Sequence, residues 1–204
     1  MYVPDAFRES RTDVIHAMIR EFGFATIVSH SPDGPFATPA PVLIDGARGP
    51  LGTLRSHLAR ANPHAALLAA GVETLVIFHG PHAYVSPSWY VSKVAVPTWN
   101  YVTVHAYGTP RVLADDAGVA RVLDDTVDQY ESGMEHPWSA AGLPAEVAVG
   151  LRKQVVAFEI EITRLDGKWK LGQNRPAADR TTAGEELIRR GETAVGRMML
   201  DAGR

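Results

Sequence analysis

The chain has 204 residues and no cysteine. Disulfides, zinc–thiolate sites and cysteine nucleophiles are therefore excluded. The net charge of −3 is small, and the sequence has no basic domain or stripe of the kind that usually accompanies nucleic-acid binding. No apolar run approaches the roughly 20 residues of a membrane helix, and the first ten residues have no apolar signal core. We therefore expect a cytoplasmic protein.

Several catalytic signatures are also missing. The chain has no G-x-S-x-G, P-loop or G-x-G-x-x-G pattern. None of its eight histidines occurs at the H-E-x-x-H spacing, and no carboxylate cluster accompanies them. Isolated histidines are usually structural, so we predict no metal site. The acidic pair Asp115-Asp116 is interpreted as a helix cap, and Asp124-Asp125 as a solvated helix face.

The composition is that of an ordinary globular protein, with 46% hydrophobic and 21% charged residues. This length and composition are enough for one sizeable core. We predict one domain over residues 1–180 and a helical tail over residues 181–204. The tail is charged and is weakened as a helix by Gly184, Gly191 and Gly196.

Hydrophobic periodicity and turn residues predict mainly β structure with peripheral helices. The turns Asp33-Gly34, Asp45-Gly46 and Asp166-Gly167 each separate β-type runs, which is typical of antiparallel hairpins. The pattern favours an antiparallel barrel over a parallel doubly wound sheet. The predicted strands are Phe24–Ser29, Phe36–Asp45, Leu51–Arg55, Glu73–His79, Tyr101–Leu113, Val155–Leu165 and Lys168–Leu171. The predicted helices are Asp13–Phe22, Asn62–Ala70, Asp116–Tyr130, Pro144–Lys153 and Ala177–Ala202.

The first candidate site is the basic segment Arg55–Pro63, predicted to follow a strand and enter a short helix. It brings together two guanidinium groups, a hydroxyl, an imidazole and the amides of a helix start. Fork-shaped cationic donors and free backbone N–H groups are what a phosphate group needs. The structural alternative is a surface helix with two solvated arginines.

The second candidate is the segment Gly80–Tyr101, which holds five of the sixteen aromatic residues of the chain. Three prolines stiffen it, and several hydroxyl and amide side chains lie among the rings. Pockets for small ligands are typically apolar with a few placed polar groups. The segment is therefore either the wall of a site for a flat ligand or a proline-rich loop closing one end of a barrel.

The third candidate is the segment Lys168–Pro176, which follows the predicted last hairpin. Strand alternation places Lys168 and Lys170 on one face and Trp169 and Leu171 on the other. Its amide and guanidinium groups suit the polar edge of a ligand. The alternative is a polar turn leading into the tail helix.

These segments, in this order, resemble the PaiB family of FMN-binding negative transcriptional regulators. The matching strings are M-Y-V-P at the start, L-R-S-H-L-A-R-A-N-P at 54–63, G-P-H-A-Y-V-S-P-S-W-Y at 80–90, V-P-T-W-N-Y at 96–101 and K-W-K-L-G-Q-N-R-P at 168–176. The strings P-W-S at 137–139 and E-I-E-I-T-R-L-D-G at 159–167 also fit. The likeness covers nearly all of residues 1–180.

The resemblance implies an antiparallel split β-barrel of the pyridoxamine-phosphate-oxidase-like, FMN-binding type, acting as a homodimer with FMN between the subunits. It implies that Arg55 holds the FMN phosphate. From their chemistry we expect Trp89, Trp99 and Asn100 to face the ring or line the mouth of the site. We expect Lys170 and Gln173 to reach the cofactor from the partner subunit. The complete set of predicted cofactor-binding residues is Arg55, Ser56, His57, Arg60, Asn62, Trp89, Trp99, Asn100, Lys170 and Gln173.

Three functions remain open from the sequence. The first is a transcriptional regulator, for which DNA binding is implied by the resemblance alone. The second is a flavin-dependent oxidoreductase, in which His57, Tyr90 or His82 assists proton transfer while the cofactor carries the redox chemistry. The third is haem binding through a histidine, with candidate ligands His16, His82 and His105.

Overall fold

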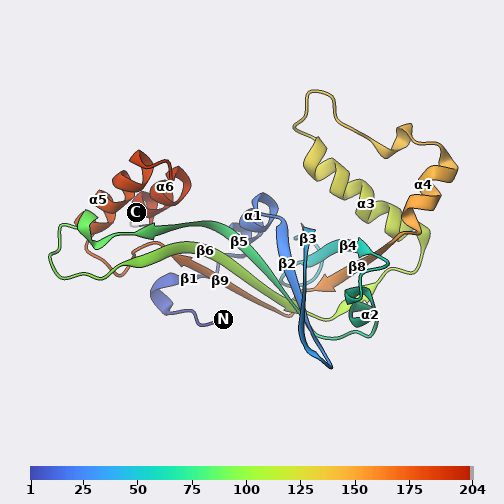
Figure 1. Ribbon diagram of the computed structural model, residues 1–204, viewed down its shortest axis with the longest axis horizontal. Helices are drawn as coiled ribbons and strands as arrows, with labels where there is room; N and C mark the ends of the chain where they lie inside the picture. Colours follow the sequence, from blue (N-terminus) through green and yellow to red (C-terminus); the bar gives the residue numbers. More distant parts are fainter. Residues whose placement is uncertain (203–204) are drawn as a thin grey trace. The chain divides into compact units, whose positions relative to one another are not determined.

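The computed structural model describes residues 1–202, which divide into two compact units (Figure 1). The first unit combines residues 1–15, residues 79–104 and those from 166 onward. The second unit combines residues 16–78 and 105–165. Across the described residues the sheet has the strand order β1-β9-β6-β5-β2-β3-β4-β8-β7. In this part of the chain no helix has the length and apolar character needed to cross a membrane.

The second unit contains the strands β2, β3, β4, β8 and β7 together with the beginning of β5. β2 pairs antiparallel with β3 around Asp33-Gly34, and β3 pairs antiparallel with β4 around Asp45-Gly46. Gly34 has a φ of 114°, which only glycine adopts readily. Two of the three predicted hairpins are thereby confirmed. The bounds are β2 Phe24–Ser31, β3 Gly34–Asp45, β4 Thr53–Ala59, β5 Thr74–Val85, β7 Pro110–Val112 and β8 Val155–Glu161.

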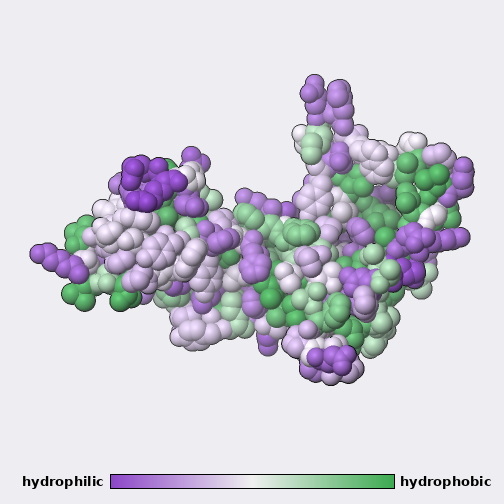
Figure 2. All heavy atoms as spheres, viewed as in Figure 1, coloured by the Kyte–Doolittle hydropathy of each residue, from purple (hydrophilic) through white to green (hydrophobic). Residues whose placement is uncertain are grey.

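The helices of this region lie close to their predicted positions: α1 Thr12–Glu21, α2 His64–Ala69, α3 Asp116–Glu131 and α4 Ala145–Arg152, with the short η3 at Ala140–Gly142. α3 packs against β4 and β8. Val119 and Val122 bury their side chains against Ala157. α4 is covered much less, and hydrophobic side chains gather on the surface over it (Figure 2).

Strand β4 extends further along the sequence than predicted. Leu54, Ser56 and Leu58 are buried on one of its faces, whereas Arg55 and His57 are half-buried on the other. The predicted strand Leu51–Arg55 therefore ends too early: Arg55 lies within β4, and the basic segment enters α2 only at His64. The alternation of side chains continues to Ala59, so the chain leaves the strand only at Arg60.

The first unit contains β1 (Arg8–Glu9), β9 (Arg164–Lys170), the later part of β5 and most of β6 (Thr98–Gly108). The prediction of a hairpin at Asp166-Gly167 is wrong, because both residues lie inside β9, which pairs with β1. Gly167 lies opposite Glu9, and a Cβ at this position would come within 2.7 Å of the Glu9 carbonyl oxygen. The glycine therefore permits a close approach of two backbones and does not form a turn.

The C-terminal segment is helical as predicted, but it forms two helices, α5 (Ala177–Arg189) and α6 (Thr193–Asp201). Gly191 has a φ of 91° in the turn between them. A Cβ on Gly196 would come within 2.7 Å of the Gly184 carbonyl oxygen, so these glycines let the two helices pack closely. The short η1 (Asp5–Phe7) and η2 (Pro87–Trp89) complete this unit. The predicted boundary between residues 180 and 181 stays a prediction.

Candidate functional site

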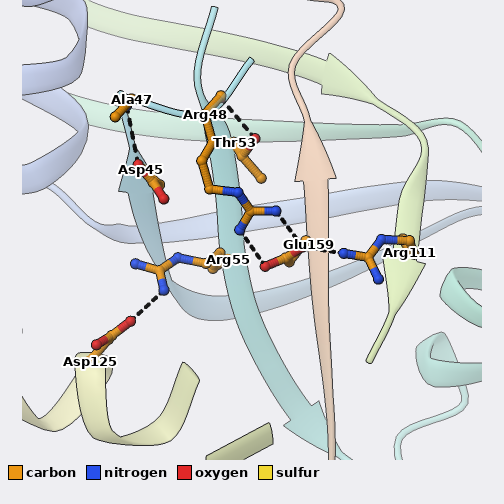
Figure 3. Close-up of polar contacts among 8 residues, drawn as sticks. All are labelled: Asp45, Ala47, Arg48, Thr53, Arg55, Arg111, Asp125 and Glu159. Atoms are coloured by element: carbon orange, nitrogen blue, oxygen red, sulfur yellow. Dashed lines mark hydrogen bonds and ion pairs between the residues drawn. The ribbon is translucent and has the colours of Figure 1, made fainter. Parts of the chain in front are cut away.

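A row of charged side chains crosses three neighbouring strands in the second unit (Figure 3). In the antiparallel register Arg55 of β4 lies opposite Glu159 of β8, and Glu159 lies opposite Arg111 of β7. Residues directly opposite each other on neighbouring strands share a face, with Cβ atoms about 5 Å apart. Arg48, from the turn after β3, reaches the same carboxylate. The sheet register and the turn after β3 therefore gather three arginines around Glu159.

Glu159 is the anchor of this row. Arg48 donates to its two carboxylate oxygens from Nη1 at 2.6 Å and from Nη2 at 2.9 Å, and Arg111 Nη2 donates at 2.6 Å. The hydrogen bonds from Arg48 hold the pKa of Glu159 below its usual range, although burial acts in the opposite direction. Glu159 therefore stays ionised at neutral pH and fixes two guanidinium groups.

These side chains border a pocket with a volume of ≈ 390 Å³. Four arginines and three carboxylates line it, so the lining alone carries an excess of one positive charge. Among the carboxylates, Asp115 caps α3 as predicted, by accepting from the backbone N–H of Gly118 at 2.7 Å. The arginines are Arg48, Arg55, Arg111 and Arg121, and the carboxylates are Asp45, Asp115 and Glu159. We refer to this site as the arginine pocket.

Arg55 is held differently from its neighbours in the arginine pocket. Its Nη1 forms a short ion pair with Asp125 of α3. Asp124 is exposed, as expected of a solvated helix face, whereas Asp125 is only partly accessible and pairs with Arg55. Arg55 Nε is buried and has no hydrogen-bond partner among the described residues. A buried donor without an acceptor is costly, so this N–H is available for a ligand.

His57 lies two residues further along β4 and shares the face of Arg55. Its Nδ1 is also buried and meets no hydrogen-bond partner within residues 1–202. Burial lowers the pKa of the His57 imidazole, so the ring is neutral at pH 7. Two polar atoms on one strand face are thus left for groups from outside this chain.

The other residues of the predicted basic segment are engaged within the second unit. Ser56 is buried on the opposite face of β4 and donates to the Pro41 carbonyl at 2.6 Å. Arg60 donates to the carbonyl oxygens of Lys153 and Val155, at 2.7 Å each. Asn62 accepts from the backbone N–H of His64 at 2.9 Å. The structure therefore brings Arg55 and His57 together on one face and directs Ser56, Arg60 and Asn62 elsewhere.

The predicted aromatic residues belong to the first unit. Trp99 is 54% exposed, and its ring centroid lies 6.1 Å from that of Tyr84 and 6.3 Å from that of His82. Trp89 lies under the guanidinium group of Arg190, at 4.9 Å from the ring centroid. Asn100 is buried, and its Nδ2 donates to the sulfur of Met199 at 3.1 Å. Of these predicted residues, Trp99 presents the most open ring.

Lys170 and Gln173 also lie in the first unit, and both have partners there. Lys170 Nζ donates to the Trp99 carbonyl at 2.8 Å and to the hydroxyl of Thr98. Burial lowers the pKa of Lys170, and the neighbouring Lys168 acts in the same direction. The Gln173 amide donates to the Trp169 carbonyl at 2.6 Å and accepts from the Leu171 N–H at 2.8 Å. The role of all ten predicted residues in FMN binding stays a prediction.

The histidines suggested as haem ligands have different surroundings. His16 is buried, and its Nε2 lies 3.0 Å from the Leu51 carbonyl oxygen. His82 is exposed, with Nδ1 3.2 Å from the Gly80 carbonyl oxygen. His105 is half-buried next to Tyr107, with ring centroids 6.4 Å apart. His82 therefore offers the most accessible imidazole of the three.

Residues outside the predicted segments supply much of the arginine pocket. Arg48, Arg111, Arg121 and Glu159 were not expected to contribute to a site. Glu159 lies in the string E-I-E-I, where alternation marks it as facing away from the apolar core. Arg111 alternates in the same way on its own short strand. The sequence pattern does not reveal the strand register, and it is this register that places Arg55, Glu159 and Arg111 in one row.

Solved structures share this mainly β fold. The FAD and heme binding protein from Mycobacterium smegmatis aligns with a TM-score of 0.60 at 20% identity, over 79% of this chain and 71% of that chain. The flavocytochrome Anf3 from Azotobacter vinelandii aligns with a TM-score of 0.60 at 15% identity, over 81% of this chain and 74% of that chain. At these identities the likeness shows the fold alone. The predicted class, an antiparallel split β-barrel with peripheral helices, is confirmed.

The chain belongs to the family described as "Putative FMN-binding domain", whose model matches residues 1–164. It is 33% identical over 187 residues to "Protease synthase and sporulation protein PAI 2" of Bacillus subtilis. This alignment covers 92% of this chain and 89% of that protein. It is 30% identical over 220 residues to "Uncharacterized protein AN0679" of Emericella nidulans, covering 88% and 87%. The predicted likeness to the PaiB family is confirmed, and FMN is the cofactor of the family.

Proposed function

We propose that two copies of this chain form a homodimer that binds FMN and acts as a negative transcriptional regulator of the PaiB type. The family match supports the cofactor. The structural observation that carries the proposal is the buried Nε of Arg55, a cationic donor without an acceptor among the described residues. FMN brings to such a site a phosphate group and a redox-active ring that absorbs visible light.

The arginine pocket suits the phosphate end of the cofactor. Arginine presents its N–H groups in a planar fork that matches the oxygens of a phosphate group, and such hydrogen bonds are stronger than neutral ones. Arg48 and Arg111 are held in place by Glu159, whereas the Nε of Arg55 has no hydrogen-bond partner among the described residues. We propose that Arg55 binds the phosphate while its neighbours provide a positive surrounding.

The aromatic segment of the first unit suits the flavin ring. The isoalloxazine is flat and largely apolar, so it packs well against an indole face. Trp99 has the exposure to do this, and Tyr84 and His82 extend the aromatic surface beside it. We propose that Trp99 stacks on the ring and that Lys170 and Gln173 act at the polar edge of a cofactor bound to the partner subunit.

Titration with FMN tests the cofactor proposal. The wild-type protein is mixed with FMN and with riboflavin, which lacks the phosphate, and binding is followed by absorbance and flavin fluorescence. We expect tighter binding of FMN than of riboflavin, and emission that is quenched in the wild type but restored in Trp99→Ala. Protein that binds neither compound would remove the proposal. Identical emission in both proteins would remove Trp99 from the ring site.

Light scattering and a mobility-shift assay test the dimer and the regulatory role. We expect the mass of a dimer, and a shift of promoter fragments at low salt, where contacts to the phosphate backbone are strongest. The shift is measured with and without FMN, because a flavin-sensing regulator must bind DNA differently in the two states. A monomer, or the absence of any shift at low salt, would contradict that part of the proposal.

A flavin oxidoreductase is the second candidate, because proteins of this fold include one named a flavocytochrome. Anaerobic mixing of the FMN-loaded protein with NADH and with NADPH distinguishes the two functions. Rapid bleaching of the flavin would favour the enzyme, and a stable yellow colour would favour the regulator. Titration with haem tests the remaining alternative, with His82→Ala as the variant at the exposed member of the three suggested ligands.

A further inference from the structure

A second pocket in the second unit differs in character from the arginine pocket. It has a volume of ≈ 270 Å³ and lies between β4, α3, η3 and α4. The two pockets share no lining residue within the described part of the chain. Most of the lining is apolar, as the side chains of Leu123, Val127 and Leu143 illustrate. We call this site the helical pocket.

The helices around the helical pocket leave it open to ligands. Trp138 and Leu151, which both line it, are 50% and 54% exposed. α4 has no buried residue, and hydrophobic side chains gather over part of this helix beside hydrophilic ones (Figure 2). Apolar side chains that remain exposed around a concave site are typical of ligand pockets.

Only a few polar groups border the helical pocket, and one of them, the imidazole of His57, has a nitrogen without a hydrogen-bond partner among the described residues. Asp116 holds Arg152 through two hydrogen bonds, from Nε at 2.9 Å and from Nη2 at 2.8 Å. Thr126 donates to the Val122 carbonyl at 2.6 Å. His57 Nδ1, in contrast, is buried and has no hydrogen-bond partner in residues 1–202. The lining therefore combines mostly apolar side chains with one buried, unsatisfied imidazole nitrogen, while the carboxylate of Asp124 lies at the solvent-exposed border.

We propose that the helical pocket binds a small aromatic alcohol, a phenol with one or two rings, whose hydroxyl group bonds to His57 Nδ1. A neutral imidazole nitrogen is either a donor or an acceptor, depending on the tautomer. A phenolic hydroxyl serves both cases, because it donates and accepts. The size is adequate, since an apolar cavity of about 150 Å³ already binds benzene. This inference does not depend on FMN and concerns a different pocket from the proposed phosphate site.

Calorimetric titration with 2-naphthol and with naphthalene tests the proposal. The two compounds share the ring system, and only 2-naphthol carries the hydroxyl group. We expect the wild type to bind 2-naphthol about fivefold more tightly than naphthalene, the gain typical of one neutral hydrogen bond. In His57→Leu we expect the two affinities to become equal while naphthalene still binds. Retained naphthalene binding shows that the variant keeps its pocket.

A second pair of variants tests the location. Ala148 lines the helical pocket from α4, whereas Ala145 lies on the same helix, is exposed and is outside the lining. We expect Ala148→Trp to reduce the affinity for both compounds at least tenfold, because the indole fills the pocket. Ala145→Trp adds the same side chain to the same helix and should leave both affinities unchanged.

Three results would overturn the proposal. The first is that the wild type binds 2-naphthol no more tightly than naphthalene. The second is that Ala148→Trp leaves both affinities intact, which would place the ligand elsewhere. The third is that riboflavin displaces 2-naphthol from the wild type and itself loses affinity in Ala148→Trp, which would make the helical pocket a flavin-ring site. None of these results bears on whether the arginine pocket binds the FMN phosphate.

Discussion

Two histidines of the second unit, the buried His64 and the half-buried His57, differ in their hydrogen-bond partners. His64, at the start of α2, has Nδ1 2.9 Å from the hydroxyl of Thr38 and Nε2 2.9 Å from the hydroxyl of Ser29. Ser29 in turn lies 2.7 Å from the hydroxyl of Thr74. His57, on β4, has a buried Nδ1 without a partner in the described chain. Burial lowers the pKa of both imidazoles.

The comparison distinguishes polar groups that stabilise the fold from polar groups that are left to bind a ligand. Around His64 every ring nitrogen is bonded, so the network stabilises the core and offers nothing to a ligand. Around His57 and Arg55, polar atoms have been buried without compensation, which a protein retains where an external group completes the site. The lowered pKa alone does not distinguish the two cases, whereas the count of hydrogen-bond partners does.

Replacing each histidine by leucine should give the largest contrast. We expect His64→Leu to lower the free energy of unfolding by about 2–4 kcal/mol, because two hydrogen bonds are lost and two buried hydroxyls keep fewer partners. We expect His57→Leu to change it by less than about 1 kcal/mol, since an unsatisfied nitrogen is replaced by an apolar group. Urea denaturation of both variants measures the difference. Equal losses would show that His57 is as structural as His64.

The same reasoning is tested at Arg55, the residue proposed to bind the FMN phosphate. We expect Arg55→Ala to weaken FMN binding by about 1.5–3 kcal/mol, the range for a hydrogen bond to a charged group. Arg121→Ala provides the matched control, because it removes a guanidinium that also lines the arginine pocket but is exposed. A smaller loss is expected there. Unchanged affinity in Arg55→Ala would remove Arg55 from the phosphate site.

Local patterns predicted most of the elements in this fold. Apolar periodicity located α1 and α3, and Asp-Gly turns located the hairpins after β2 and β3. The third Asp-Gly pair does not form a turn. Its glycine is needed instead where β1 and β9 approach each other closely. A turn signal and a packing requirement are identical in sequence when both demand glycine.

The sequence predicted those parts of the candidate site that lie within a single segment, and it did not predict the residues that other segments contribute. The importance of Arg55 and His57 was apparent from their residue types, and alternation explains why both point from one face of β4. Glu159 and Arg111 enter through strand register, and Asp125 enters through the packing of α3 on β4. These contacts join residues that are 48 or more positions apart in the sequence, which residue type and spacing do not encode.

The pH dependence of stability gives the next largest effect. Both histidines have a folded pKa below the ordinary value of about 6.5, so the unfolded chain binds more protons as the pH falls below that value. Stability is therefore complete above pH 6.5 and is lost as the pH falls toward the folded pKa values. The slope for each histidine has an upper limit of about 1.4 kcal/mol per pH unit, which applies where the unfolded imidazole is charged and the folded one is neutral.

Denaturation between pH 7 and pH 5 measures this slope. In His57→Leu one of the two contributions is removed, and the slope should be smaller than in the wild type. Glu159 does not titrate in this window, because its hydrogen bonds from Arg48 lower its pKa. A wild-type stability that does not change between these pH values would mean that neither imidazole is kept neutral by the fold.

The smallest effect concerns the ion pair that occupies Arg55. Asp125→Asn removes the charge that competes with a phosphate group while keeping the shape of the side chain. The pair is partly exposed, with 37% of the Asp125 side chain accessible, and such pairs contribute up to about 1 kcal/mol. We therefore expect FMN to bind about threefold to fivefold more tightly. Asp124→Asn is the control, because it removes the same charge from the neighbouring residue, which lines the helical pocket instead. If both variants tighten binding equally, the gain comes from net charge, and Arg55 does not exchange Asp125 for the phosphate.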